Sequence, residues 1–93
     1  MNREKERAYN GIIAVLEWEV NELERIATEL ELAWERAKVH RAAIMQGKNT
    51  FFECWMFDGA YERCLELLYR FHVLEQDMEE TEKSRAYILT HME

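Results

Sequence analysis

Apolar residues recur every seven positions along the first half of the chain, and this repeat constrains the fold more than any other feature. Its members are Tyr9, Leu16, Leu23, Leu30, Ala37 and Ile44. A second, mostly apolar set lies between them and includes Ile12, Val20, Ile26 and Ala33. Two apolar positions in each heptad are the pattern of an α-helix that packs along one face against another helix. The repeat predicts a helix over about residues 3–46.

Signals that end one helix and start another lie in the middle of the chain. Gly47 is well placed to follow a helix C-terminus in the left-handed conformation, which glycine adopts without steric cost. Thr50 is followed three residues later by Glu53, a spacing that predicts a reciprocal capping box at the next helix. These signals predict a turn over residues 47–50 and a second helix over about residues 51–91.

The second half carries its own seven-residue ladder, formed by Phe57, Cys64, Phe71 and Met78. Because the linker is short, the two helices are expected to be antiparallel neighbours. Asp58-Gly59 leaves two alternatives open: a continuous second helix, or a kink or break that separates a short aromatic helix at residues 51–57. Cys54 and Cys64 lie about 15 Å apart along this helix, so we expect two reduced, buried thiols without a disulfide.

The composition indicates one all-α domain over residues 1–93, a long antiparallel helical hairpin. The chain contains no proline and three glycines, which is the usage of long helices. In the expected register Ala33 faces Arg63 and His40 lies near Phe57. Two long helices have little core between them, so we expect a second copy to complete a homodimeric four-helix bundle.

Charge and hydropathy bear on location and on partners. No apolar signal-peptide core and no run of about 18 apolar residues is present, so we expect a cytoplasmic protein without a membrane partner. The formal net charge is −7, which argues against direct binding to nucleic acid, because phosphate contacts need a surplus of Lys and Arg. An acidic chain can instead attract the basic groove of a nucleic-acid-binding protein.

The stretch "FFECWMF" at residues 51–57 holds more apolar side chains than one helix face buries. Phe51, Phe52, Trp55 and Met56 are spread over most of the helix circumference. One interpretation makes them the core between two copies of the hairpin. The other makes them a hydrophobic hot spot for a different protein. Both interpretations predict that these residues bind a partner.

Acidic residues form two runs that the hairpin is expected to bring alongside each other. The first contains Glu17, Glu19, Glu22 and Glu24, and the second contains Glu75, Asp77, Glu79, Glu80 and Glu82. Three of these residues, Glu19, Glu75 and Glu82, are expected to interrupt apolar stripes. Buried carboxylates must be hydrated, paired or coordinated. One interpretation is therefore a hydrated polar layer into which Arg85 or Arg25 reaches.

The same belt offers candidates for two kinds of binding. Candidate ligands for a divalent metal such as Mg²⁺ are Glu19, Glu22, Glu75, Glu79 and Glu82. Candidate contacts for a basic partner are Glu75, Asp77, Glu79 and Glu80.

The spacings Glu19-x-x-Glu22 and Glu79-x-x-Glu82 resemble the paired acidic motifs of the all-helical nucleotide pyrophosphohydrolases, which hold magnesium. The likeness covers only these positions and lacks the fuller run of acids and the substrate-binding basic residues of that family. The resemblance implies a Mg-dependent nucleotide hydrolase as one alternative function.

The sequence carries no catalytic signature, so we expect no enzymatic activity and no cofactor. The preferred hypothesis is a small acidic helical regulator or inhibitor, of the kind found in phages and mobile elements, that binds another protein. Its contacts would be the aromatic cluster, the acidic face or both. Alternatives are an acidic nucleic-acid mimic that blocks a basic protein, the Mg-dependent hydrolase, and a structural component of a larger assembly.

Overall fold

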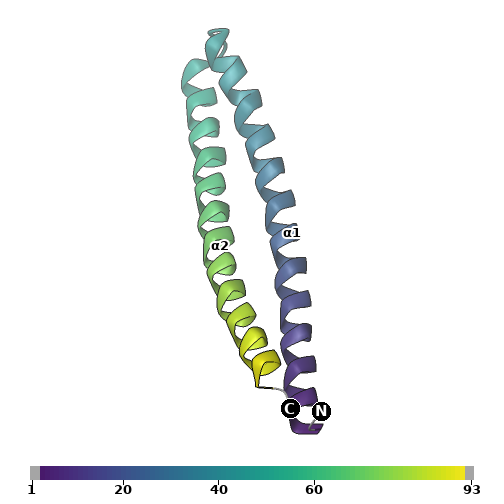
Figure 1. Cartoon of the computed structure of the whole chain (residues 1–93). Coiled ribbons are helices and arrows are strands. Elements are labelled where there is room, and N and C mark those ends of the chain that lie inside the picture. The colour runs from purple at the N-terminus through teal and green to yellow at the C-terminus, as the bar shows by residue number, and fades with distance from the viewer. Residues whose placement is uncertain (1–2, 92–93) are drawn as a thin grey trace. The chain divides into compact units, whose positions relative to one another are not determined.

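The computed structural model describes residues 3–91 of the chain as two α-helices. Helix α1 spans Arg3–Met45 and α2 spans Thr50–Thr90, and the two run antiparallel from a short loop (Figure 1). The predicted all-α hairpin is confirmed, and the helix ends lie within one residue of the predicted positions. The predicted domain also included residues 1, 2, 92 and 93, which lie outside the described residues.

Gly47 follows the end of α1, as predicted, but the residue that caps the start of α2 differs from the predicted one. Gly47 has φ +73°, and its N–H bonds the carbonyl of Ile44 while Lys48 N–H bonds that of Ala43. These two bonds close a Schellman motif. The cap of α2 is Asn49, at φ +42°, whose carbonyl accepts the Glu53 N–H at 2.9 Å.

The predicted capping box at Thr50 is therefore wrong, because Thr50 already belongs to the helix. Asparagine tolerates the left-handed conformation that this tight loop requires, whereas β-branched threonine does not. The Glu53 carboxylate contacts His40 instead, with 2.5 Å between its Oε2 and the ring Nδ1.

Helix α2 is continuous through Asp58 and Gly59, which settles the alternative that the sequence left open. An interior glycine costs a helix about 1 kcal/mol relative to alanine, a local cost that the packing of a long amphipathic face outweighs. A Cβ added at Gly59 would meet no atom within 4 Å. No close approach of the neighbouring helix therefore requires a glycine here.

Buried and half-buried side chains follow the heptads along both helices. On α1 they include Tyr9, Leu16, Leu23, Leu30 and Ala37, with Ile12, Glu19, Ile26 and Ala33 between them. On α2 they include Phe57, Cys64, Phe71 and Met78, with Ala60, Leu67 and Leu74 between them. Both predicted ladders therefore face inward, as a helix–helix seam requires. Val20, which was predicted in the second apolar set of the first helix, is exposed, and its neighbour Glu19 is buried instead. Tyr61, Leu68 and Leu89 on α2 are also exposed.

The chain divides into two compact units. Unit 1 combines Met1–Glu24 with His72–Glu93, and unit 2 is Arg25–Phe71, which includes the loop. Residues 25–71 contain seven Lys or Arg and seven Asp or Glu, so unit 2 has no net charge. The other five basic and twelve acidic residues give unit 1 the whole formal charge of −7.

The register in unit 2 differs from the predicted one by about one helical turn. His40 pairs with Glu53, and Arg63 pairs with Glu29, at 3.2 Å. Arg63 also lines a hollow together with Ala33, the residue that it was predicted to face. Helix α1 ends and α2 begins one residue earlier than predicted. This displacement accounts for about half of the difference, because it moves each opposing pair by two residues. All opposing positions shift with it.

No helix within residues 3–91 combines the length and the apolar character that crossing a membrane requires.

Candidate functional site

The predicted aromatic cluster lies at the start of α2, in unit 2, and most of it is exposed. Phe51 is 91% exposed, Trp55 68% and Phe52 51%, whereas Met56 is half-buried. The rings of Phe52 and Trp55 are tilted against each other with centroids 6.3 Å apart. These four residues are called the aromatic surface below. A side chain as large and apolar as Phe51 gains free energy when a partner removes it from water.

A hollow of about 580 Å³ adjoins the aromatic surface and is lined in part by Trp55 and Met56. Its polar lining includes His40 and Arg63, and both side chains are already engaged. His40 contacts Glu53, and Arg63 bonds Glu66 at 3.1 Å in addition to Glu29. The lining also includes Arg36, Asp58 and Glu62. The hollow therefore combines the apolar surface of Trp55 and Met56 with charged side chains.

A second hollow in unit 2 was not found from the sequence. It is a groove of about 460 Å³ lined by Ala27, Leu30, Glu31, Trp34, Tyr61, Cys64, Leu65, Leu68 and Phe71. Glu31 is the one charged residue of this lining. These nine residues are called the apolar groove below. The sequence did contain a signal for this groove. Tyr61, Leu65 and Leu68 are apolar, lie three and four positions apart and fall outside the inward ladder, so they are neighbours on the helix surface.

The predicted acidic contacts lie in unit 1, and all four are exposed: Glu75, Asp77, Glu79 and Glu80. Glu75 and Glu79 line a hollow of about 500 Å³ together with Leu23, Met78, Glu82 and Lys83. Lys83 also lies 3.8 Å from Glu80, a distance and exposure at which an ion pair contributes little stability. These acids present a negative surface in water.

Of the three carboxylates expected to interrupt the apolar stripes, only Glu19 is buried. It is 3% exposed, and its Oε1 has no hydrogen-bond partner among the described residues. Glu75 is exposed. Glu82 is also exposed and is paired with Arg85 on the same helix. The expectation failed for Glu75 and Glu82 because their row, which continues from Tyr61 and Leu68, lies outside the seam.

The five candidate metal ligands are not gathered into one group. Glu75, Glu79 and Glu82 share the hollow described above, and neither Glu19 nor Glu22 lines it. Within residues 3–91 no three His, Cys, Asp or Glu side chains have positions that would hold a metal ion. Divalent cations need several oxygen ligands at short distance, and the described side chains do not provide that arrangement.

Arg85 makes a two-pronged contact with Glu82, from Nε to Oε2 at 2.8 Å and from Nη2 to Oε1 at 2.5 Å. The hydrogen bond from Arg85, with its positive charge, lowers the pKa of Glu82. Hydrogen bonds to Glu82 and then to Tyr9 raise the pKa of Arg85. The contact with Tyr9 ties α2 to α1 within unit 1.

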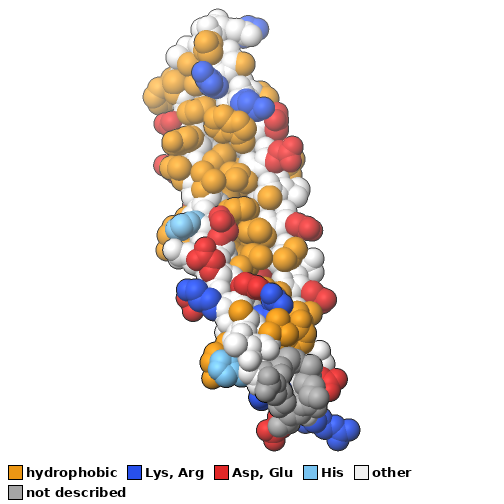
Figure 2. All heavy atoms as spheres, viewed as in Figure 1, with side chains coloured by type: hydrophobic (Ala, Val, Ile, Leu, Met, Phe, Trp, Pro, Cys, Tyr) orange, Lys and Arg blue, Asp and Glu red, His pale blue; other side chains and the backbone are white. Residues whose placement is uncertain are grey.

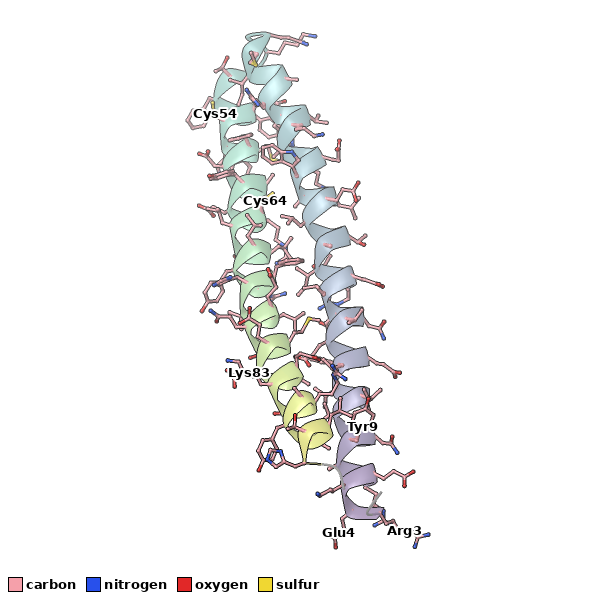
Figure 3. All side chains as sticks on the ribbon, in the orientation of Figure 1. Arg3, Glu4, Tyr9, Cys54, Cys64 and Lys83 are labelled. Atoms are coloured by element: carbon pink, nitrogen blue, oxygen red, sulfur yellow. The ribbon has the colours of Figure 1, made fainter. Side chains whose placement is uncertain are left out.

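The two cysteines differ in exposure. Cys64 is buried in the seam, as predicted, but Cys54 is exposed, so the expectation of two buried thiols is wrong for Cys54. Figure 3 shows the two side chains well separated along α2. Cys54 is exposed because residue 54 lies outside the inward heptad positions Glu53 and Phe57.

No protein-family model, curated protein or solved structure matches this chain.

Proposed function

We propose that this chain is a non-enzymatic protein-interaction module that forms a homodimer and binds another protein through the aromatic surface. The role that we propose for this module is that of a small cytoplasmic regulator or inhibitor. The observation that carries it is the exposure of Phe51, Phe52 and Trp55 within two turns of one helix. Aromatic side chains are enriched among the residues that dominate the binding energy of protein interfaces.

The accessible surface supports the homodimer. The chain exposes 7217 Å², whereas a compact monomer of 11.3 kDa would expose about 5700 Å². The difference of about 1500 Å² exceeds the roughly 800 Å² that each partner buries in a standard interface. The excess is therefore large enough for one standard interface, such as that of a homodimer.

The aromatic surface is tested by Trp55→Ala and Phe52→Ala, with Tyr69→Ala as the control. Tyr69 is 70% exposed but belongs neither to the aromatic surface nor to the apolar groove. Immobilised wild type and variants are incubated with an extract of the source cells, and bound proteins are quantified by mass spectrometry. We expect specific partners to be lost with Trp55→Ala and retained with Tyr69→Ala. Equal recovery by all variants would refute the proposed contact.

A second candidate function has its own observation, the placement of the whole formal charge of −7 on unit 1. Such a surface suits a basic protein, including one whose groove normally binds nucleic acid. Here the exposed acids Asp77, Glu79 and Glu80 would take the place of phosphates.

Charge reversal tests this candidate with a matched control. Glu79→Lys combined with Glu80→Lys is compared with Asp58→Lys combined with Glu62→Lys, which makes the same change in charge on unit 2. Binding to a labelled polylysine probe is measured over a range of salt concentrations. We expect the first pair to weaken binding more and to flatten its salt dependence. Equal effects would show that only total charge matters.

A further inference from the structure

We propose that the apolar groove of unit 2 is the surface on which a second copy of this chain docks. The inference rests on the proposed homodimer and names its interface. The groove shares no residue with the aromatic surface, so the two interfaces can be tested separately. Figure 2 shows hydrophobic side chains gathered on the visible face near the loop, in the part of the chain that contains unit 2.

The groove arises from the sizes of the side chains that the sequence places in and beside the seam of unit 2. Three of the buried seam residues of unit 2 are small: Ala33, Ala37 and Cys64. Such residues bring the two helices together but supply little bulk beside the seam. The large apolar residues stand at the groove rim, where Trp34 is 41% exposed and Leu65 and Leu68 are each 48% exposed. The unit therefore leaves several bulky apolar side chains on its surface, although Ile26 and Leu67 are buried.

The rim and floor provide both parts of a self-complementary contact. Trp34 on α1 and Tyr61, Leu65 and Leu68 on α2 form exposed ridges, while buried Cys64 lies lower in the groove. Ridges spaced three and four residues apart fit the grooves of another helix pair. Under two-fold symmetry the same patch is used by both copies, so each must offer a ridge and a groove. This patch offers both.

The distribution of charge favours unit 2 over unit 1 as the interface between two copies. Two identical chains of charge −7 repel each other, but all of this charge is on unit 1. A contact between two copies of unit 2 joins units without net charge, and Glu31 is the one charged residue in the lining. A contact through unit 1 would bring together two surfaces of like charge, which is unfavourable at low salt. A second copy therefore fits the groove.

The test measures the mass of the full chain by light scattering over a range of concentrations. The variant is Leu65→Asp combined with Leu68→Asp, and the control is Leu32→Asp combined with Val39→Asp. The control pair is exposed, apolar and in unit 2, but lies outside the groove. We expect a dimeric wild type, a dimeric control and a groove variant whose dimer dissociation constant rises at least a hundredfold. Circular dichroism establishes that both variants remain helical.

A cross-linking experiment decides the case in which the groove variant fails to fold. Leu65→Cys and, separately, Leu32→Cys are made in a chain carrying Cys54→Ser and Cys64→Ala. Mild oxidation is expected to give a covalent dimer with Leu65→Cys, because residues near a two-fold axis approach their own copies. The Leu32→Cys chain should remain uncross-linked. A dimeric chain in which Leu65→Cys does not cross-link faster than Leu32→Cys would overturn the assignment of the groove.

The outcomes separate this inference from the proposed function. A wild type that is monomeric at all concentrations removes both the homodimer and the groove interface. A wild-type dimer that persists in the folded groove variant overturns the groove interface alone. A dimer that Trp55→Ala dissociates but the groove variant does not would move the interface to the aromatic surface.

Discussion

Units 1 and 2 share one helical repeat but use it differently. Unit 2 is electrically neutral and buries five apolar residues: Ile26, Ala33, Ala37, Cys64 and Leu67. Unit 1 carries the whole charge of −7, and its buried described residues are Leu74 and the carboxyl-bearing Glu19. The comparison teaches that a heptad pattern specifies where the seam lies. The residues at the seam then determine how well each unit is packed, and the exposed residues outside the seam determine whether its surface repels or binds another chain.

The largest expected change in the free energy of unfolding comes from a mutation in the apolar core of unit 2. Leu67 is 1% exposed, so Leu67→Ala should lower the free energy of unfolding by about 2–5 kcal/mol through lost burial and a cavity. The control is Leu32→Ala, at a residue that is 59% exposed, which should cost about 0.5 kcal/mol or less. Urea unfolding at one protein concentration measures both. Equal losses would show that Leu67 is not part of a packed core.

The second prediction concerns the buried carboxyl group of unit 1. Replacing Glu19 by leucine removes a polar oxygen without a partner among the described residues, so Glu19→Leu should stabilise the fold by about 1–3 kcal/mol. Thermal unfolding should show a rise of several degrees in Tm. The matched control is Glu17→Leu, at an exposed position. A lower Tm for Glu19→Leu would show that Glu19 has a partner in the assembled protein.

The smallest effect is a pH dependence at Glu82. Arg85 holds the folded-state pKa of Glu82 below the ordinary value of 4.5, so the ionised carboxylate favours folding. This contribution is present above pH 4.5 and is lost as the pH falls through the lowered pKa. Glu82→Gln should therefore flatten the fall in Tm below pH 4.5, whereas the control Glu80→Gln should alter it less. If Tm depends on pH in the same way for Glu82→Gln and for the wild type, the contact with Arg85 does not cause the loss of stability at low pH.

Much of the fold was predictable because it depends on local rules. The heptads located both helices and the inward ladders, and Gly47 located the end of α1. The cap at Asn49 was missed because Thr50 also suits a helix start, and only the loop geometry distinguishes the two. Part of the register difference arises because a one-residue change in the loop moves every opposing pair by two residues.

The candidate sites were less predictable, because exposure depends on which neighbour covers a residue. Phe51 and Trp55 were singled out from the sequence, and both are exposed. Glu19, Glu75 and Glu82 looked equivalent as interruptions of apolar rows, but only Glu19 lies in the seam. The apolar groove was missed because its lining comes from both helices in a register that the sequence did not determine.

The sequence by itself determined that the chain forms two long helices, where they end to within one residue, and that the two seven-residue ladders face inward. These properties arise from helix periodicity and from residues at the helix ends, which act over a few positions. Only the tertiary structure decided which side chains meet across the seam, that a carboxyl is buried in unit 1 and that a groove opens in unit 2. Those features depend on register and on the bulk of opposing side chains, which join residues far apart in the sequence.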